Sequence, residues 1–185
     1  MIYIESKRRK IERIKEQYPN ADILDLTSDS PYRYGQILSP FYPHGNIPIP
    51  FTPNFYATCV ESIWQGLKVF VNSGIDFATF RNKTMHNLKR TTFVNGKILV
   101  HRKGIKGTEI LDYRTARKEI YLPTYKWVLE NVSEVSAVIN KIKERSQTHD
   151  LVFLDYNTNQ DIENEKRPLS HAALVKLYIE GKYPV

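Results

Sequence analysis

A carboxylate, an amide and an amine recur at helical spacing near the middle of the chain, where they could act on a charged substrate. Glu61, Gln65 and Lys68 stand at positions i, i+4 and i+7 of the segment 59–71. At this spacing the three side chains share one stripe of a helix, beside Trp64. A carboxylate in such a place stabilises developing positive charge or accepts a proton. The alternative is a capping Glu, a neutral Gln and a Lys that points to solvent.

A helix over residues 59–71 must position this stripe. Its apolar side chains recur at helical spacing and favour a mostly buried helix. Thr58 followed by Glu61 three residues later has the spacing of a capping box. Upstream, residues 28–57 contain six prolines and many aromatic residues. We interpret them as a packed, proline-stiffened loop that could wall a pocket, because long structureless loops are uncommon in compact domains.

The segments that carry this stripe resemble the signature of the NADAR (YbiA-like) superfamily. That signature is an L-S-N-F-like stretch followed by a Thr-Ser-Glu-His-x-x-Gln-Ala-x-Lys-Phe helix. Within residues 38–70 the matching positions are Leu38, Ser39, Phe41, Thr58, Glu61, Gln65, Lys68 and Phe70. Pro40 stands where the family has Asn, and Ser62 stands where it has His. The glycine- and tryptophan-rich segment near the family's C-terminus has no counterpart here.

The resemblance implies a YbiA-like fold and an N-glycosidase that hydrolyses an N-ribosyl bond in an ADP-ribose-like or ribosylated-nucleobase substrate. Glu61 would stabilise positive charge on the ribose and orient water, with its pKa raised by partial burial. Lys68 would hold a phosphate or keep Glu61 ionised. Trp64 would stack on a base, or it would equally be a core residue. Further substrate-binding candidates on the matching segments are Ser39, Phe41 and Gln65.

A second polar group lies toward the C-terminus. Asp155 ends a predicted buried strand, which is a common place for a functional residue, and we include it among the catalytic candidates. His171 opens the last predicted helix directly after Ser170, and we include it among the substrate-binding candidates. The alternatives are an Asp that caps a turn and a His that only begins a helix.

Basic residues are concentrated between Arg81 and Lys106, in a chain with a formal net charge of +7. The Asn95-Gly96 pair flanked by β-forming residues predicts a β-hairpin over residues 90–104. Its basic side chains would grip the phosphates of a nucleotide or of nucleic acid, or they would simply be solvated. Arg90 is the substrate-binding candidate from this segment. Few aromatic residues interleave with the charges, so a single-strand-binding platform is not expected.

The remaining pattern predicts one α+β domain over residues 1–185, mainly helical, with the hairpin and short buried strands. Helices are expected over residues 5–17, 133–145 and 170–180, and two more within residues 111–132, the second beginning near Pro123. Strands are expected over residues 22–26 and 151–156.

Several classes of protein are not expected from the sequence. Cys59 is the only cysteine, so an internal disulfide is excluded and a reducing, cytoplasmic location is favoured. The sequence has neither a secretory signal pattern nor an apolar run long enough for a membrane span. It has no P-loop, G-x-G-x-x-G, CxxC or H-E-x-x-H pattern, so we expect no cofactor and no metal.

Three functions remain open. The first is a metal-independent N-glycosidase that acts on a nucleotide or ADP-ribose-like small molecule. The second is a non-catalytic module that binds such a ligand, which the missing C-terminal segment favours. The third is a basic protein associated with nucleic acid. No membrane partner is expected.

Overall fold

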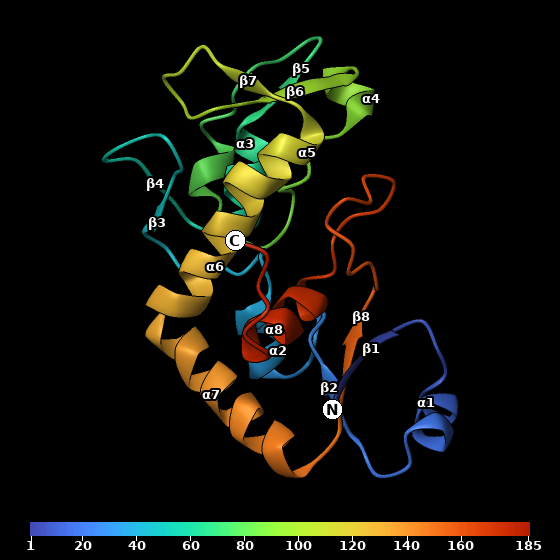
Figure 1. Ribbon diagram of the computed structural model, residues 1–185. Coiled ribbons are helices and arrows are strands. Elements are labelled where there is room, and N and C mark those ends of the chain that lie inside the picture. Colours follow the sequence, from blue (N-terminus) through green and yellow to red (C-terminus); the bar gives the residue numbers. More distant parts are fainter. The chain divides into compact units, whose positions relative to one another are not determined.

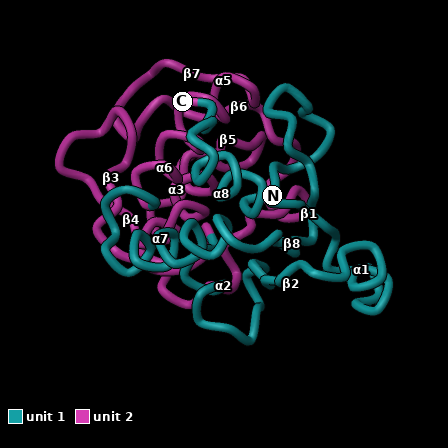
Figure 2. The backbone as a smooth tube through the Cα atoms, turned by 60° about the horizontal axis from the view of Figure 1, so that its bottom comes forward, with its two compact units in different colours: residues 1–39, 129–184 teal, residues 40–128, 185 magenta.

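The computed structural model describes residues 1–185 and mixes helices with small sheets (Figure 1). The chain divides into two compact units, coloured teal and magenta in Figure 2. Unit 1 comprises Met1–Ser39 and Leu129–Pro184, and unit 2 comprises Pro40–Val128 together with Val185. No helix of the structure combines the length and the apolar character needed to cross a membrane.

Unit 1 is built on a parallel sheet of three strands in the order β1-β8-β2. The strands are β1 (Ile2–Ser6), β2 (Asp22–Asp25) and β8 (Leu151–Asp155). All five residues of the central strand β8 are buried, as expected for a strand covered on both faces. The strands predicted over residues 22–26 and 151–156 are confirmed. Because the sheet is parallel, unit 1 is better described as α/β than as α+β.

Four helices surround this sheet in unit 1: α1 (Ile11–Gln17), α2 (Arg33–Leu38), α7 (Ser133–Thr148) and α8 (His171–Ile179). The prediction of a helix from residue 5 is wrong, because the chain first forms β1 along β8. The prediction of a loop throughout residues 28–57 is also wrong, because α2 forms within it. The two C-terminal helices are confirmed, and α7 extends three residues beyond the predicted end.

Unit 2 contains an antiparallel sheet in the order β5-β6-β7. Its strands are β5 (Lys68–Phe70), β6 (Ile98–Arg102) and β7 (Ile110–Leu111). The hairpin predicted over residues 90–104 is wrong, because β6 pairs with β5, far upstream in the chain. Asn95 and Gly96 instead end the short helix α4 (Thr92–Asn95), with Gly96 at φ 78°. A positive φ of this size favours glycine.

The helical part of unit 2 begins with α3 (Val60–Gly66) and the 3-10 turn η1 (Thr79–Arg81). Later, α5 (Tyr113–Ala116), the π-helical turn η2 (Arg117–Tyr121) and α6 (Leu122–Asn131) follow one another without a break. The second helix, α6, begins at Leu122, next to Pro123 as predicted, but it continues from α5 through η2. Pro123 is the second residue of α6, directly after η2, and its missing N–H falls where the hydrogen-bond pattern changes.

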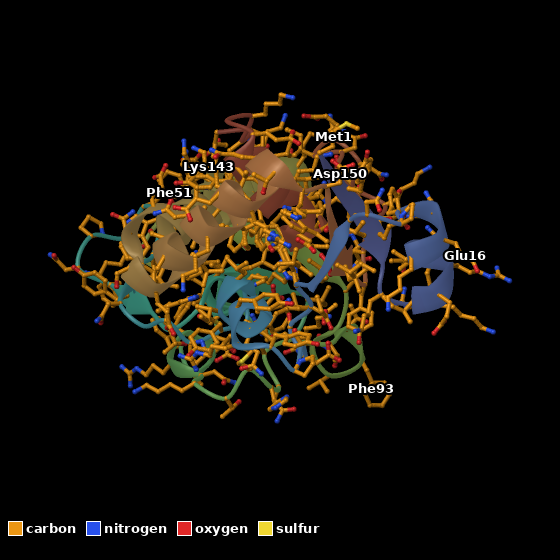
Figure 3. All side chains as sticks on the ribbon, turned by 90° about the horizontal axis from the view of Figure 1, so that it is seen from below. Met1, Glu16, Phe51, Phe93, Lys143 and Asp150 are labelled. Carbon is orange, nitrogen blue, oxygen red and sulfur yellow. The ribbon has the colours of Figure 1, made fainter.

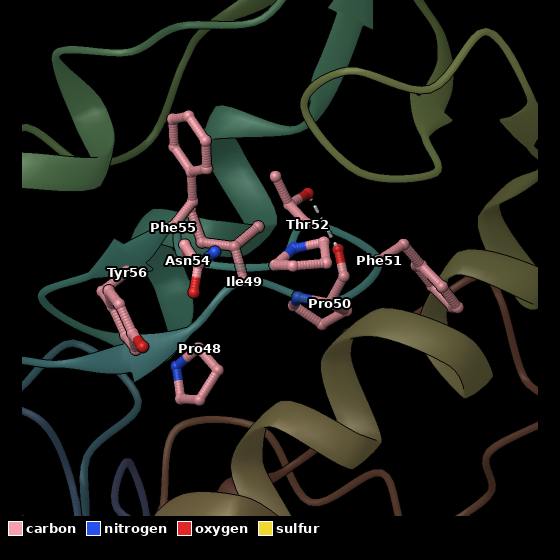
Figure 4. Close-up of a pocket in the computed structure, with 9 residues that line it drawn as sticks. Pro48, Ile49, Pro50, Phe51, Thr52, Asn54, Phe55 and Tyr56 are labelled. Atoms are coloured by element: carbon pink, nitrogen blue, oxygen red, sulfur yellow. Dashed lines mark hydrogen bonds between the residues drawn. The ribbon is translucent and has the colours of Figure 1, made fainter.

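The proline-rich segment forms a shallow groove in unit 2 (Figure 4). The two-residue strands β3 (Ile47–Pro48) and β4 (Tyr56–Ala57) pair antiparallel, and residues 48–56 line a groove of about 370 Å³. Phe51 and Asn54 adopt left-handed backbone conformations, with φ of 58° and 66°. None of the candidate site residues lines this groove.

Replacing Gly66 by Ala is expected to destabilise the protein, although Gly to Ala in a helix ordinarily stabilises. A Cβ at Gly66 would lie 2.3 Å from Cε1 of Phe80, whose ring is buried. Overpacking of this kind costs about 1–3 kcal/mol. Urea unfolding of Gly66→Ala measures the loss. Gly74→Ala is the matched control, since a Cβ there meets nothing within 4 Å. A Gly66→Ala protein as stable as the control would contradict this packing.

Candidate functional site

The helix α3 that carries Glu61 is capped by a residue other than the one predicted. Cys59 is the N-cap: its Sγ accepts from the Ser62 N–H, and the Cys59 N–H donates to Ser62 Oγ, both at 3.2 Å. The Thr58 hydroxyl instead donates to the carbonyl of Asn82, at 2.5 Å. The predicted Thr58–Glu61 capping box is therefore wrong. As a consequence, the Glu61 carboxylate is not used to cap the helix.

Glu61, Gln65 and Lys68 form a continuous buried chain of hydrogen bonds. Gln65 Nε2 donates to Glu61 Oε1 at 2.6 Å, and Lys68 Nζ donates to Gln65 Oε1 at 3.1 Å. The three residues are only 7%, 4% and 8% exposed. The side-chain amide of Gln65 thus links a carboxylate to an ammonium group and fixes the orientation of both.

Lys68 reaches this chain by a route that the helical spacing does not describe. The helix α3 ends at Gly66, and Lys68 begins strand β5 after the C-cap Leu67. The prediction of a helix through residue 71 is wrong, because the chain pairs with β6 from Lys68 onward. Lys68 lies near Glu61 because the chain turns directly from helix to strand.

Burial shifts the pKa values of Glu61 and Lys68 in the directions that favour the uncharged form of each side chain. Desolvation raises the pKa of Glu61, and the hydrogen bond from Gln65 and the charges of Lys68 and Lys89 offset this only in part. Desolvation likewise lowers the pKa of Lys68, while the charge of Glu61 raises it. A carboxyl group with a raised pKa can accept and return a proton closer to neutral pH than an exposed one.

Trp64 lies beside Lys68 and is enclosed by aromatic rings. The His101 ring stacks on it with centroids 3.9 Å apart, and the rings of Tyr113 and Tyr121 meet it edge-on at 5.5 and 5.6 Å. Lys68 Nζ lies 5.5 Å from the Trp64 ring. With 8% of its surface exposed, Trp64 supports its neighbours and offers little free face to a base.

Phe41 and Lys89 lie next to each other near the start of α3. The Glu61 N–H donates to the carbonyl of Pro40 at 2.8 Å, which places the neighbouring Phe41 next to α3. Lys89 Nζ lies 5.7 Å from the Phe41 ring, and its charge acts on both Glu61 and Lys68. Lys89 is exposed, so it is a cation that a ligand can reach from solvent.

Arg90 holds the end of α3 and is engaged by the protein itself. Its guanidinium donates to the carbonyls of Gln65, Lys68 and Gly74 and to Ser73 Oγ, at 2.7 to 3.2 Å. It also packs over the Phe70 ring, 4.7 Å from its centroid. These contacts make Arg90 a positioning residue for Gln65 and Lys68, and they leave it little capacity to bind a substrate.

The other three predicted site residues lie in unit 1. Asp155 accepts from Ser170 Oγ and the Tyr156 N–H at 2.7 Å, and one of its oxygens lies 3.3 Å from His171 Nδ1. His171 Nε2 contacts the carbonyl of Leu26, which can only accept, so this nitrogen carries a hydrogen. Ser39 Oγ donates to Ser28 Oγ at 2.7 Å.

These contacts in unit 1 have a structural effect. Asp155 and Ser170 together cap the start of α8, and His171 links α8 to the end of β2. The structure therefore brings together Glu61, Trp64, Gln65, Lys68, Phe41 and Arg90 in unit 2, and Asp155 with His171 in unit 1.

Sequence reasoning did not select His101 or Lys89 as site residues. His101 pairs directly opposite Lys68 in the β5–β6 ladder, a contact that no local pattern reveals. The only signal was that His101 shares a strand face with Lys97 and Leu99. Lys89 was one of many basic residues in its segment.

The positive charge of the chain resides in unit 2. Residues 40–128 contain 13 Lys and Arg against 5 Asp and Glu, a net charge of +8, although the whole chain carries +7. Unit 1 holds the other 14 basic and 15 acidic residues, a net charge of −1. The unit that contains Glu61 therefore attracts anionic ligands. No group of three or more His, Cys, Asp or Glu side chains is arranged to hold a metal ion.

Comparison with models of protein families identifies the family of this chain. Residues 6–175 match the model described as a family of unknown function (DUF6939). The chain belongs to this family. The matched residues include parts of both units, among them Glu61, Gln65 and Lys68. No curated protein shows a significant match to the sequence.

Proposed function

We propose that this DUF6939 protein is an N-glycosidase that hydrolyses an N-ribosyl bond in an ADP-ribose-like or ribosylated-nucleobase substrate, on a fold related to that of the YbiA-like proteins. The observation that carries the proposal is the buried Glu61–Gln65–Lys68 chain. Its residues are those on which the resemblance to the NADAR signature rests.

The chemistry of N-ribosyl hydrolysis fits a carboxylate of this kind. As the bond between the base and the ribose breaks, positive charge develops on the ribose ring, and a nearby carboxylate stabilises it and orients the attacking water. Gln65 holds one Glu61 oxygen through its Nε2–H, so the carboxylate keeps its orientation without a direct ion pair. The raised pKa of Glu61 suits a group that takes a proton from water and returns it.

The cations of unit 2 suit a phosphorylated substrate. Lys68 and Lys89 both act on the Glu61 carboxylate, one buried and one exposed. In the proposed complex, Lys89 receives the phosphate that arrives from solvent, and Lys68 keeps Glu61 ionised. Phe41, next to Lys89, contributes an apolar face for the sugar or base.

The third hypothesis, a nucleic-acid-associated protein, named the hairpin over residues 90–104 as its binding surface, and this hairpin does not form. The basic residues of unit 2 remain, so only a binding experiment decides this hypothesis. A binding module without turnover uses the same residues as the enzyme, and only a product assay separates the two.

The proposal is tested by a product assay on a panel of ADP-ribose conjugates and ribosylated bases. Chromatography detects the free base that the protein releases. Release from one or more members supports the N-glycosidase. Saturable binding without release supports the binding module. A steep fall in single-stranded nucleic acid binding with salt would instead support the third hypothesis.

A further inference from the structure

His101 is a buried polar residue with unsatisfied hydrogen-bonding groups at the centre of unit 2. The side chain is 1% exposed, and neither Nδ1 nor Nε2 has a hydrogen-bond partner. Buried polar groups in folded proteins nearly always have partners, because an unpaired one loses its contacts with water and gains nothing in return. Two orphaned atoms on one ring therefore call for an explanation.

Packing alone does not require a histidine at this position. The ring stacks on Trp64 with centroids 3.9 Å apart and lies 6.4 Å from the Tyr113 ring. A phenylalanine would make the same aromatic contacts without burying two unpaired nitrogens. What histidine adds is its capacity for hydrogen bonds, and no group of the protein uses it.

Burial and nearby charge determine the protonation state of the His101 ring. Burial and the neighbouring charge of Lys68 lower the pKa of His101 to about 3, so the imidazole is neutral at physiological pH. A neutral imidazole offers one N–H donor and one nitrogen acceptor, on different edges of the ring. Such a ring suits an uncharged polar group, whereas a phosphate is attracted to the lysines of this unit.

We infer that His101 is a specificity-determining residue of the Glu61 site and hydrogen-bonds an uncharged polar group, such as an amide, on the base of an N-ribosylated ligand. The inference rests on the proposed function, and it requires the ligand to open the packing around His101, whose ring nitrogens are enclosed in this structure. Its position supports it: His101 pairs with Lys68 across the β5–β6 ladder, and both contact Trp64. Lys68 in turn is connected to the Glu61 carboxylate through the side chain of Gln65.

The test compares binding of a base-bearing and a base-free ligand by calorimetry. Nicotinamide mononucleotide carries a base with a carboxamide, and ribose 5-phosphate lacks the base. His101→Phe keeps the aromatic stack and removes both nitrogens. We expect it to weaken nicotinamide mononucleotide binding by about ten-fold or more and to leave ribose 5-phosphate binding unchanged. His101→Asn, which keeps a donor and an acceptor, is expected to retain part of the preference for the base.

Thermal unfolding supplies the second readout. His101→Phe removes two buried unsatisfied atoms, so its Tm is expected to rise by about 2–4 °C. Thr124→Val is the matched control, because Thr124 Oγ1 is also buried without a partner in unit 2. This control is expected to gain stability without a change in either affinity. The inference is supported if both variants gain Tm but only His101→Phe loses affinity for nicotinamide mononucleotide.

Two results overturn the assignment of His101 alone. They are equal affinity of the wild-type protein for the two ligands, and equal weakening of both ligands by His101→Phe. Failure of the wild-type protein to bind nicotinamide mononucleotide also overturns this inference, whereas the proposed function is decided separately by release of base from the panel. Binding of both ligands without release of nicotinamide contradicts turnover of this nucleotide and leaves the test of His101 intact.

Discussion

Glu61→Gln is expected to lower turnover by about 10²–10⁴-fold while the protein stays folded, since loss of a general acid or base has effects of this size. Glutamine keeps the volume of the side chain, and its Oε1 can still accept from Gln65 Nε2. Only the charge and the ionisable proton are lost. Glu109→Gln is the matched control: it makes the same change on an exposed carboxylate of unit 2 that pairs with Lys103. It is expected to leave turnover unchanged.

The same substitution has a signed effect on stability. The folded state raises the pKa of Glu61, so folding favours its protonated form. The contribution of this group to stability is therefore fully present below its unfolded pKa and is lost as the pH rises through its folded pKa. The free energy of unfolding of Glu61→Gln minus that of the wild type should therefore increase as the pH rises across that window, so the variant becomes relatively more stable. A difference that is constant with pH would contradict a buried, ionisable Glu61.

Phe153→Ala is expected to be the most destabilising of the core substitutions considered, at about 3–5 kcal/mol. Phe153 is 0% exposed in the central strand β8 and is flanked on both sides by the parallel strands β1 and β2. Removing its ring leaves a cavity that a strand paired on two edges cannot close. A loss of this size is a large part of the stability of a typical domain.

The same substitution at Phe93 is the control for this prediction. Phe93 is 98% exposed and projects from the surface in Figure 3. Phe93→Ala is expected to change the free energy of unfolding by no more than about 0.5 kcal/mol. Urea unfolding of the two variants gives both values. Equal effects would mean that β8 is not the buried centre of unit 1.

The elements that were predictable from the sequence are those with a strong local pattern. Residues 151–154 form a continuous apolar run, and the structure has a buried strand there. The apolar spacing predicts Val135, Val138, Ile139 and Ile142 on the inner face of α7; Val138 is half-buried and the other three are buried. Ser170 caps α8 with its side chain. In these segments local propensity and tertiary packing favour the same structure.

The errors occurred where long-range pairing decides the structure. The strand β1 forms because Ile2 to Ser6 pair with residues 151–155, far away in sequence. In unit 2 the Asn95-Gly96 signal was correctly interpreted as a positive-φ position, but it ends a helix there and does not turn a hairpin. The pairing of β5 with β6 ended the predicted helix early and brought His101 next to Lys68.

The candidate site was predictable only in part for the same reason. The proximity of Glu61 and Gln65 follows from helical spacing within α3. Lys68 joins them through a turn from helix to strand, and His101 joins through the strand pairing. Arg90 was selected for its charge, yet its guanidinium serves the backbone of the site. The roles of these last three residues depend on contacts that only the folded chain makes.

The central claim is tested most directly by comparing the wild-type protein with Glu61→Gln in one product assay. The assay measures release of free base from a panel of ADP-ribose conjugates and ribosylated bases, and ligand binding is measured in the same samples. The expected result is release by the wild-type protein, loss of release in Glu61→Gln, and comparable binding by both. Binding by both proteins with no release by either, or equal release by both, would contradict an N-glycosidase that works through Glu61.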